Sequence, residues 1–257
     1  MTESKFKKLC TDSFTKLFKK AKATDEKQFV TSFFVFHKFF NYNIMSSVND
    51  IEFKEVLQFL NSFLPLLENG KLDNKNKTRI RIMLYYHIIE VDTIYIILFN
   101  MIRTIQNRDY SSIIPYKSKK GKLIETEYPS KKIEVLIKES NKIGIQFGEI
   151  YLDFYFSYLR NAFVHSQYFL DKNGNFNISK HMLPTNLMVS KKPKEKIHFR
   201  YDEIEVIFQK TLYYLESFIN VYNSFNDAYK DGNSYETNFG RIRYYQDKHT
   251  WSFDKNK

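Results

Sequence analysis

The chain has 257 residues, a hydrophobic content of 43% and a formal net charge of +11. This composition is sufficient for a sizeable core, and the single cysteine, Cys10, excludes an internal disulfide and a thiolate zinc site. Lysines throughout the first 25 residues argue against a signal peptide, and the most apolar run, residues 82–102, carries charged side chains near its centre. These features predict a soluble, cytoplasmic protein.

The basic excess has two explanations, and the sequence leaves both open. A strongly basic chain suits a polyanionic partner such as RNA. The chain is also rich in Lys, Asn, Ile, Tyr and Phe, the mixture that an AT-rich genome produces. Charge alone therefore does not establish RNA binding.

The N-terminal part of the chain is predicted to be helical. Apolar residues at helical spacing predict a basic amphipathic helix over residues 4–22, which we interpret as a surface helix docked on the core. Binding to a membrane or a partner is the alternative. Further helices are expected over residues 25–43 and 50–68, the latter ending at Asn69-Gly70. Together they form an expected N-terminal helical extension, residues 1–70.

The remainder predicts an all-α fold, with residues 71–230 as a helical bundle. Long helices are expected over about 77–107 and 131–169, the second with a bend near Gly144 and Gly148. The turn signal of LDKNGNFNIS predicts a small β-hairpin inserted after this helix. A short strand at 198 is expected to lead into a helix to about 229, followed by a polar C-terminal tail, residues 231–257.

The helix around 158–169, YLRNAFVHSQYF, carries an unusual group of polar residues. At about 100° per residue, Arg160, Asn161 and His165 share a polar arc of roughly 160° with Glu149, Asp153, Ser157 and Tyr168. Apolar side chains, including Leu152 and Leu159, occupy the opposite side. The helix is therefore expected to bury one face and present a polar strip on the other.

These residue types fit cleavage of RNA by attack of a ribose 2′-hydroxyl on the adjacent phosphodiester. Arg160 offers a planar fork of donors for phosphate, His165 can move a proton, and Asn161 can orient either one. Such a reaction needs no metal and no cofactor, and a two-fold dimer would supply a second histidine. The alternative is structural: Arg160 pairs with Asp153 or Glu149 on its own helix face, and His165 is an ordinary interfacial residue.

The pattern R-N-x-x-x-H near the end of a long helix, RNAFVH at 160–165, resembles the motif of the HEPN superfamily. Over about residues 75–230, the resemblance implies an up-and-down helical bundle that forms homodimers through its motif helices. It also implies a metal-independent endoribonuclease acting as a toxin or antiphage (abortive-infection) effector, with RNA as substrate and a possible antitoxin or defence-system partner. A catalytically inactive HEPN-like module that binds RNA or protein is the alternative.

Further positions follow from the same interpretation. The resemblance implies that Glu90 or Asp92, on an earlier helix, supports Arg160 or His165; ordinary partial exposure of these carboxylates is the alternative. Tyr168 follows the histidine by three residues, whereas the modifiable tyrosine of one HEPN subgroup follows it by two. We therefore expect Tyr168 to stack on a base or to pack against the protein, not to be modified. His87 and Glu90 form a single H-x-x-E pair without a second such motif, so no metal site is predicted.

Two lysine-rich segments are predicted to be loops, at 117–122 and 190–196. If RNA binds, they are the expected phosphate contacts; otherwise they are solvated loops. The lysines in question are Lys117, Lys119, Lys120, Lys191 and Lys192.

Overall fold

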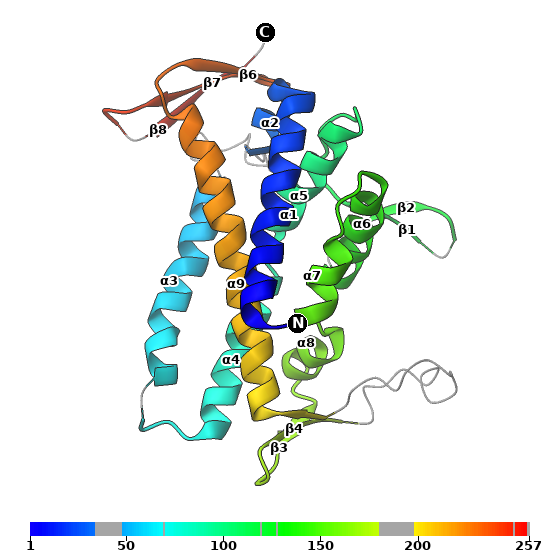
Figure 1. Ribbon diagram of the computed structural model, residues 1–257, viewed down its shortest axis with the longest axis vertical. Helices are drawn as coiled ribbons and strands as arrows, with labels where there is room; N and C mark the ends of the chain where they lie inside the picture. Colours follow the sequence, from blue (N-terminus) through cyan, green and yellow to red (C-terminus); the bar gives the residue numbers. More distant parts are fainter. Residues whose placement is uncertain are drawn as a thin grey trace.

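A computed structural model describes residues 1–33, 48–68, 70–118, 120–126, 128–179, 198–248 and 250–255. Its long helices run roughly along one axis, and small sheets lie at the two ends and on one side (Figure 1). The helices are α1 (Glu3–Thr24), α2 (Glu26–Phe33), α3 (Val48–Glu68), α4 (Asn74–Ile89), α5 (Asp92–Ile105), α6 (Pro129–Lys142), α7 (Phe147–Phe154), α8 (Ser157–Val164) and α9 (Tyr201–Asn226), which a 3₁₀ turn (Asp227–Tyr229) extends. The strands are β1 (Pro115–Lys117), β2 (Leu123–Glu125), β3 (Tyr168–Leu170), β4 (Asn175–Ile178), β5 (His198–Arg200), β6 (Ser234–Thr237), β7 (Gly240–Tyr245) and β8 (Thr250–Lys255).

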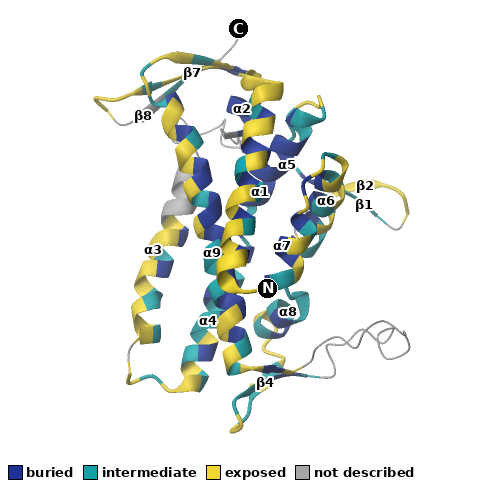
Figure 2. Cartoon of the chain, viewed as in Figure 1, coloured by how far each residue is buried: buried dark blue, intermediate teal, exposed yellow. Residues whose placement is uncertain are grey.

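The first helix has the buried face that its sequence predicts. Its apolar stripe is buried except at Leu9, which is partly buried, and the buried and exposed positions lie on different sides of the helix (Figure 2). The stripe packs chiefly against α9 and α5. Its buried members are Phe6, Cys10, Phe14, Leu17, Phe18 and Ala21. The predicted helix over 25–43 corresponds to α2 as far as residue 33, and its remainder lies outside the described residues.

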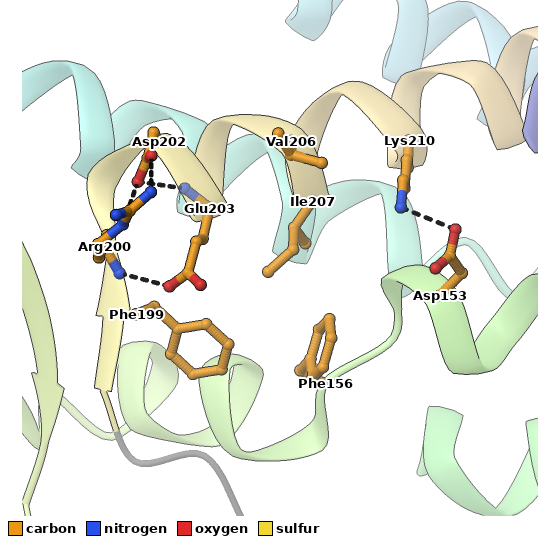
Figure 3. A pocket seen from close by; sticks show the side chains of 9 residues that line it. All are labelled: Asp153, Phe156, Phe199, Arg200, Asp202, Glu203, Val206, Ile207 and Lys210. Atoms are coloured by element: carbon orange, nitrogen blue, oxygen red, sulfur yellow. Dashed lines mark hydrogen bonds and ion pairs between the residues drawn. The ribbon is translucent and has the colours of Figure 1, made fainter. Parts of the chain in front are cut away.

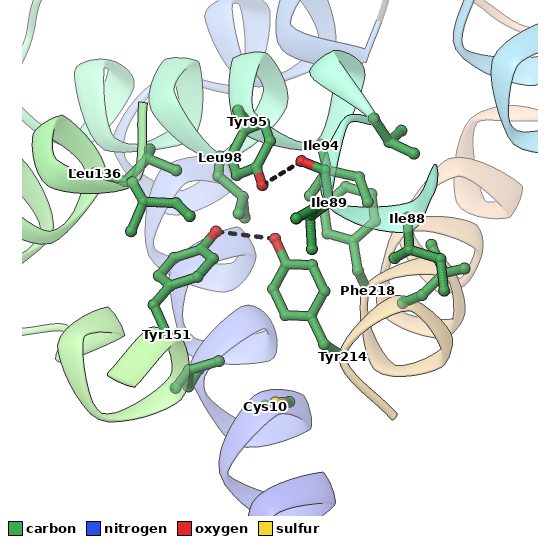
Figure 4. Close-up of a cluster of buried hydrophobic side chains, with 14 of the residues drawn as sticks. Cys10, Ile88, Ile89, Ile94, Tyr95, Leu98, Leu136, Tyr151, Tyr214 and Phe218 are labelled. Carbon is green, nitrogen blue, oxygen red and sulfur yellow. Dashed lines mark hydrogen bonds between the residues drawn. The ribbon is translucent and has the colours of Figure 1, made fainter. Parts of the chain in front are cut away.

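The core is rich in aromatic side chains, some of which carry buried hydroxyls (Figure 4). Tyr151 of α7 and Tyr214 of α9 share a hydrogen bond of 2.8 Å between their hydroxyl groups, so both polar atoms are satisfied in an apolar surrounding. α9 has 26 residues, a length of about 39 Å, and it contacts α1, α4 and α7. It therefore holds together helices that are far apart in the sequence.

The helix predicted over 77–107 is interrupted at Glu90, and this interruption shapes the candidate site. α5 begins with Asp92, an acidic side chain that suits a helix N-terminus. The hydroxyl of Tyr95 donates a hydrogen bond of 2.7 Å to the carbonyl of Ile89, one of the acceptors left open where α4 ends. Glu90 is the C-cap residue that follows α4, and from this position its side chain reaches α8.

The helix predicted over 131–169 is divided into α6, α7 and α8. Gly144, at φ +73°, ends α6 because a left-handed residue closes a helix and glycine adopts this conformation without strain. Between α7 and α8, the backbone N–H of Phe156 leaves the helical pattern and donates to the hydroxyl of Tyr85 at 2.9 Å. The expected single polar strip is therefore wrong: Leu152, placed on its apolar side, is 79% exposed.

The chain is mostly helical, as predicted, but it is not all-α. The hairpin expected after the motif helix is present as β3 and β4, and β5 completes a three-stranded antiparallel sheet. A second hairpin, β1–β2, projects beside α6 (Figure 1).

The segment predicted as a polar tail contains β6, β7 and β8 in a third antiparallel sheet. In β7, a Cβ at Gly240 would lie 2.2 Å from the carbonyl oxygen of Asp254, so only glycine permits the close approach to β8. Alternate residues face the bundle, and among them Thr237 and Ile242 are buried. This alternation gives the segment a buried face despite its polar composition.

Side chains of the predicted extension and of the C-terminal sheet belong to the same buried cluster as the helical bundle. The described residues form one such cluster. The domain boundaries expected near residues 70 and 230 stay predictions. One stretch, Asn74–Ile105, is long and apolar enough to cross a membrane by composition, with a mean hydropathy of 1.6 in its most apolar window. That window is 72% buried inside the protein, which is consistent with a core segment of a soluble protein.

Candidate functional site

The three residues of the RNxxxH pattern line one small pocket of about 140 Å³. Part of its lining comes from α8 and the residue that follows it, and part comes from the start of α6. The lining residues are Tyr128, Pro129, Ser130, Tyr155, Ser157, Arg160, Asn161 and His165. The pocket therefore gathers a cation, an amide, an imidazole and several hydroxyl groups.

Arg160 is held by three neighbours. Its Nε and Nη2 atoms both contact the same carboxylate oxygen of Glu90, at 2.8 and 2.7 Å. Its Nη1 donates to the Oδ1 atom of Asn161 at 2.9 Å, and the guanidinium lies 5.4 Å from the centre of the Tyr86 ring. The side chains of Arg160 and Glu90 are only 15% and 26% exposed, so this ion pair is largely removed from water.

The guanidinium keeps donor capacity despite these contacts. Arginine has five N–H donors, and the three contacts to Glu90 and Asn161 use one each on Nε, Nη2 and Nη1. One N–H on each terminal nitrogen is therefore left for an anion in the pocket. Because Asn161 accepts through its oxygen, its NH₂ group is also available as a donor.

His165 lies just beyond the end of α8. The backbone N–H of Ser166 donates to the carbonyl of Phe163, and that of Gln167 donates to the carbonyl of Ala162 at 2.8 Å. With Ser166 at φ +54°, these bonds form a Schellman motif that closes the helix. The imidazole of His165 is exposed, and within the described part of the chain it makes no hydrogen bond.

The wall from α6 was missed by sequence reasoning. Tyr128 is the N-cap of α6, Pro129 occupies the first helical position and Ser130 follows. Tyr155, between α7 and α8, interacts through its hydroxyl with Ser130. Burial raises the pKa of Tyr155, outweighing the opposite effects of Ser130 and Arg160, so its hydroxyl stays protonated. The aromatic–Pro–Ser start of this helix was visible in the sequence, but nothing there placed it opposite α8.

The other predicted supporting residues divide between the pocket and elsewhere. Glu90 contacts Arg160, whereas Asp92 contacts the buried Lys132 of α6. Asp153 accepts from Lys210 at 2.7 Å and does not contact Arg160, because the break between α7 and α8 turns the two residues apart. Tyr168 stacks on the Phe176 ring, with centres 4.6 Å apart, as part of the β3–β4 hairpin.

The structural alternative, in which Arg160 pairs with Glu149 or Asp153 on its own helix face, is therefore wrong in its partner, since the carboxylate that contacts Arg160 is Glu90. His87 and Glu90 also do not share a site: the His87 ring packs on Phe59, with centres 4.3 Å apart. Among the described residues, no group of three or more His, Cys, Asp or Glu side chains is placed to hold a metal ion.

A larger hollow of about 370 Å³ lies between α7, β5 and α9 (Figure 3). Phe156, Phe199 and Ile207 form its apolar floor. Its charged side chains are occupied with one another, in a Lys210–Asp153 pair and an Arg200–Asp202 pair. It contains no histidine and none of the RNxxxH residues, so it offers less chemistry than the smaller pocket.

The structure describes some of the lysines that were predicted to bind RNA and leaves others undescribed. Lys117 and Lys120 are exposed on the β1–β2 hairpin, which contacts α6. Lys119, Lys191 and Lys192 lie outside the described residues.

Comparisons of the chain with models of protein families, with curated proteins and with solved structures found no match. The functional interpretation therefore depends on the chemistry of the pocket and on the residue pattern.

Proposed function

We propose that the chain is a metal-independent endoribonuclease with a HEPN-like helical bundle. The observation that carries this proposal is the gathering of Arg160, Asn161 and His165 in one pocket, with the imidazole exposed and the arginine held in a fixed orientation. A phosphate clamp beside an imidazole that can carry a proton is the equipment that 2′-hydroxyl attack requires.

In the proposed reaction, a ribose 2′-hydroxyl loses its proton and its oxygen forms a bond to the adjacent phosphorus. The bond from phosphorus to the 5′-oxygen breaks, and that oxygen takes up a proton. The products are a 2′,3′-cyclic phosphate and a 5′-hydroxyl. His165 carries one of the two protons, and the remaining N–H donors of Arg160, with the NH₂ group of Asn161, stabilise charge on the phosphoryl oxygens.

One histidine in the pocket leaves the second proton transfer to another group. We propose that a second copy of the chain supplies its own histidine across a two-fold axis, as the resemblance implies. Large apolar side chains lie exposed near the pocket in sequence, as an interface would require: Leu152 is 79%, Val164 39% and Phe169 60% exposed. On the same resemblance, the protein acts in the cytoplasm as a toxin or antiphage effector, with an antitoxin or defence protein as a possible partner.

The proposal is tested by single-turnover RNA cleavage at saturating enzyme, with thermal melting of each variant. His165→Ala should slow cleavage by about 10²- to 10⁴-fold, because it removes a proton-transfer group. Since the side chain is exposed, the melting temperature should stay within about 2 °C of wild type. Arg160→Lys should also fail, because an ammonium cannot reproduce the planar fork. Wild-type cleavage by a folded His165→Ala protein would remove the catalytic role.

A second function is favoured by one contact: Glu90 offsets the charge of Arg160. A site whose cation is already paired suits a catalytically inactive HEPN-like module that binds RNA or a protein. The RNA cleavage assay distinguishes the two functions, because the inactive module binds RNA or a protein without cleaving RNA.

A further inference from the structure

The size of the pocket limits which part of an RNA it can hold. Sites that enclose drug-sized ligands typically measure about 300–1,000 Å³, whereas this pocket measures about 140 Å³. It has room for a phosphodiester group beside Arg160 and His165 but not for a whole nucleotide. If the proposed function holds, the base next to the cleaved phosphate must therefore lie outside the pocket, at its rim.

Tyr128 is the exposed aromatic side chain at that rim. It lines the pocket from the start of α6 and is 65% exposed. Its backbone is fixed, because its carbonyl accepts from the N–H groups of Lys131 and Lys132 and its own N–H donates to the hydroxyl of Thr126. Its ring makes no aromatic or cation–π contact with the described residues. An exposed ring that projects from a fixed backbone is suited to stacking on a base.

The surface continues from Tyr128 onto the β1–β2 hairpin. This hairpin is attached to the start of α6 by Lys131, whose ammonium lies 4.7 Å from the centre of the Tyr116 ring. Beyond this contact, Lys117, Lys120 and Lys122 are exposed, and Leu123 of β2 is 69% exposed. Cations therefore share this surface with exposed apolar side chains and with the Tyr128 ring. Grooves that bind single-stranded nucleic acids have this composition, whereas exposed rings find no open base in a duplex.

We propose that Tyr128 is a base-stacking residue and that single-stranded RNA leaves the pocket over this ring and along the β1–β2 hairpin. Stacking positions the phosphate without taking part in the proton transfers. Because every base has a face that can stack, the contact selects unpaired RNA rather than a sequence. The proposal rests on the proposed function in one respect only, namely that RNA enters the pocket.

The test measures binding without chemistry. The probe is a fluorescein-labelled single strand of about twelve uridines, a length within the usual site size, with 2′-fluoro groups that prevent attack. Fluorescence anisotropy gives its Kd for wild type, Tyr128→Ala, Tyr128→Phe and a control, Tyr245→Ala. Tyr245 is a partly exposed tyrosine on the C-terminal sheet, at the opposite end of the molecule from α8 (Figure 1).

Tyr128→Ala should weaken binding by roughly 5- to 150-fold, whereas Tyr128→Phe and Tyr245→Ala should bind within about 2-fold of wild type. The loss should disappear on an abasic strand of the same length, because a strand without bases has nothing to stack. An unchanged Kd for Tyr128→Ala, or an equal loss on the abasic strand, would overturn the proposal. An unchanged Kd for Tyr128→Ala is also the result expected if Tyr128 and the β1–β2 hairpin bind a protein instead of RNA.

Cleavage and binding measured on the same proteins distinguish a failure of the stacking role from a failure of the proposed nuclease activity. If wild type cleaves unmodified RNA while Tyr128→Ala leaves the Kd unchanged, the nuclease stands and the stacking role falls. If Tyr128→Ala weakens binding but wild type does not cleave RNA, the stacking role stands and the nuclease falls. If wild type does not bind the probe, the stacking role falls as well.

Discussion

Replacing Glu90 by glutamine tests the contact that organises the pocket. The change keeps the shape of the side chain but removes the charge that pairs with Arg160. Fully exposed ion pairs contribute about 0.2–1 kcal/mol, and losing one partner of a fully buried pair costs about 3–5 kcal/mol. With side-chain exposures of 15% and 26%, this pair lies between these limits. We expect a loss of about 1–3 kcal/mol in the free energy of unfolding.

For a protein of this size, that loss corresponds to a melting temperature lower by about 2–12 °C. Differential scanning calorimetry measures it, with Glu205→Gln as the matched control. Glu205 also pairs with an arginine, Arg81, at 2.7 Å, but it is 57% exposed, so its loss should cost under about 1 kcal/mol.

Glu90→Gln should also leave Arg160 with an uncompensated charge. The plot of log Kd for RNA against log salt concentration should then steepen by about 0.7, the contribution of one phosphate contact on a single strand. Equal melting temperatures for Glu90→Gln and wild type would contradict the ion pair. An unchanged salt dependence would contradict its role in offsetting the charge of Arg160.

Three further predictions concern the hairpin, the core and the assembly. Replacing Lys120 and Lys122 by glutamine should flatten the same salt plot by about 1.4 in slope and leave single-turnover cleavage of bound RNA unchanged. Burial lowers the pKa of His87, so below about pH 6.5 the unfolded chain binds more protons than the folded one. The melting temperature should therefore fall as the pH drops below this value, and His87→Phe should reduce the dependence. Light scattering at micromolar concentration should show a dimer, and a monomer that still cleaves RNA would contradict a site shared between two copies.

Much of the helical content could be predicted from the sequence, because apolar periodicity reports which face of a helix is buried. In α1 the predicted stripe is buried at every position but Leu9, which is partly buried. The interruptions were harder to see, since they depend on partners distant in sequence. The hydroxyl of Tyr85 accepts the N–H of Phe156 between α7 and α8, and no local signal identifies such a contact.

The same limitation explains what was found and missed in the candidate site. Arg160, Asn161 and His165 are close in sequence, and one short helix with its closing turn is enough to bring them to one pocket. Tyr128 and Ser130 reach that pocket only through the packing of α6, so their position depends on tertiary structure. The C-terminal sheet was missed because its strands bury only alternate residues, and a polar composition conceals this pattern.

The chemistry of the RNA ends tests the central claim most directly. Purified wild-type protein is incubated with single-stranded RNA in EDTA, and the termini of the products are determined by mass spectrometry. Attack by the 2′-hydroxyl predicts cleavage that persists in EDTA and yields 2′,3′-cyclic phosphate and 5′-hydroxyl ends. Products with 5′-phosphate ends would contradict the account, because they require an activated water in place of the ribose hydroxyl.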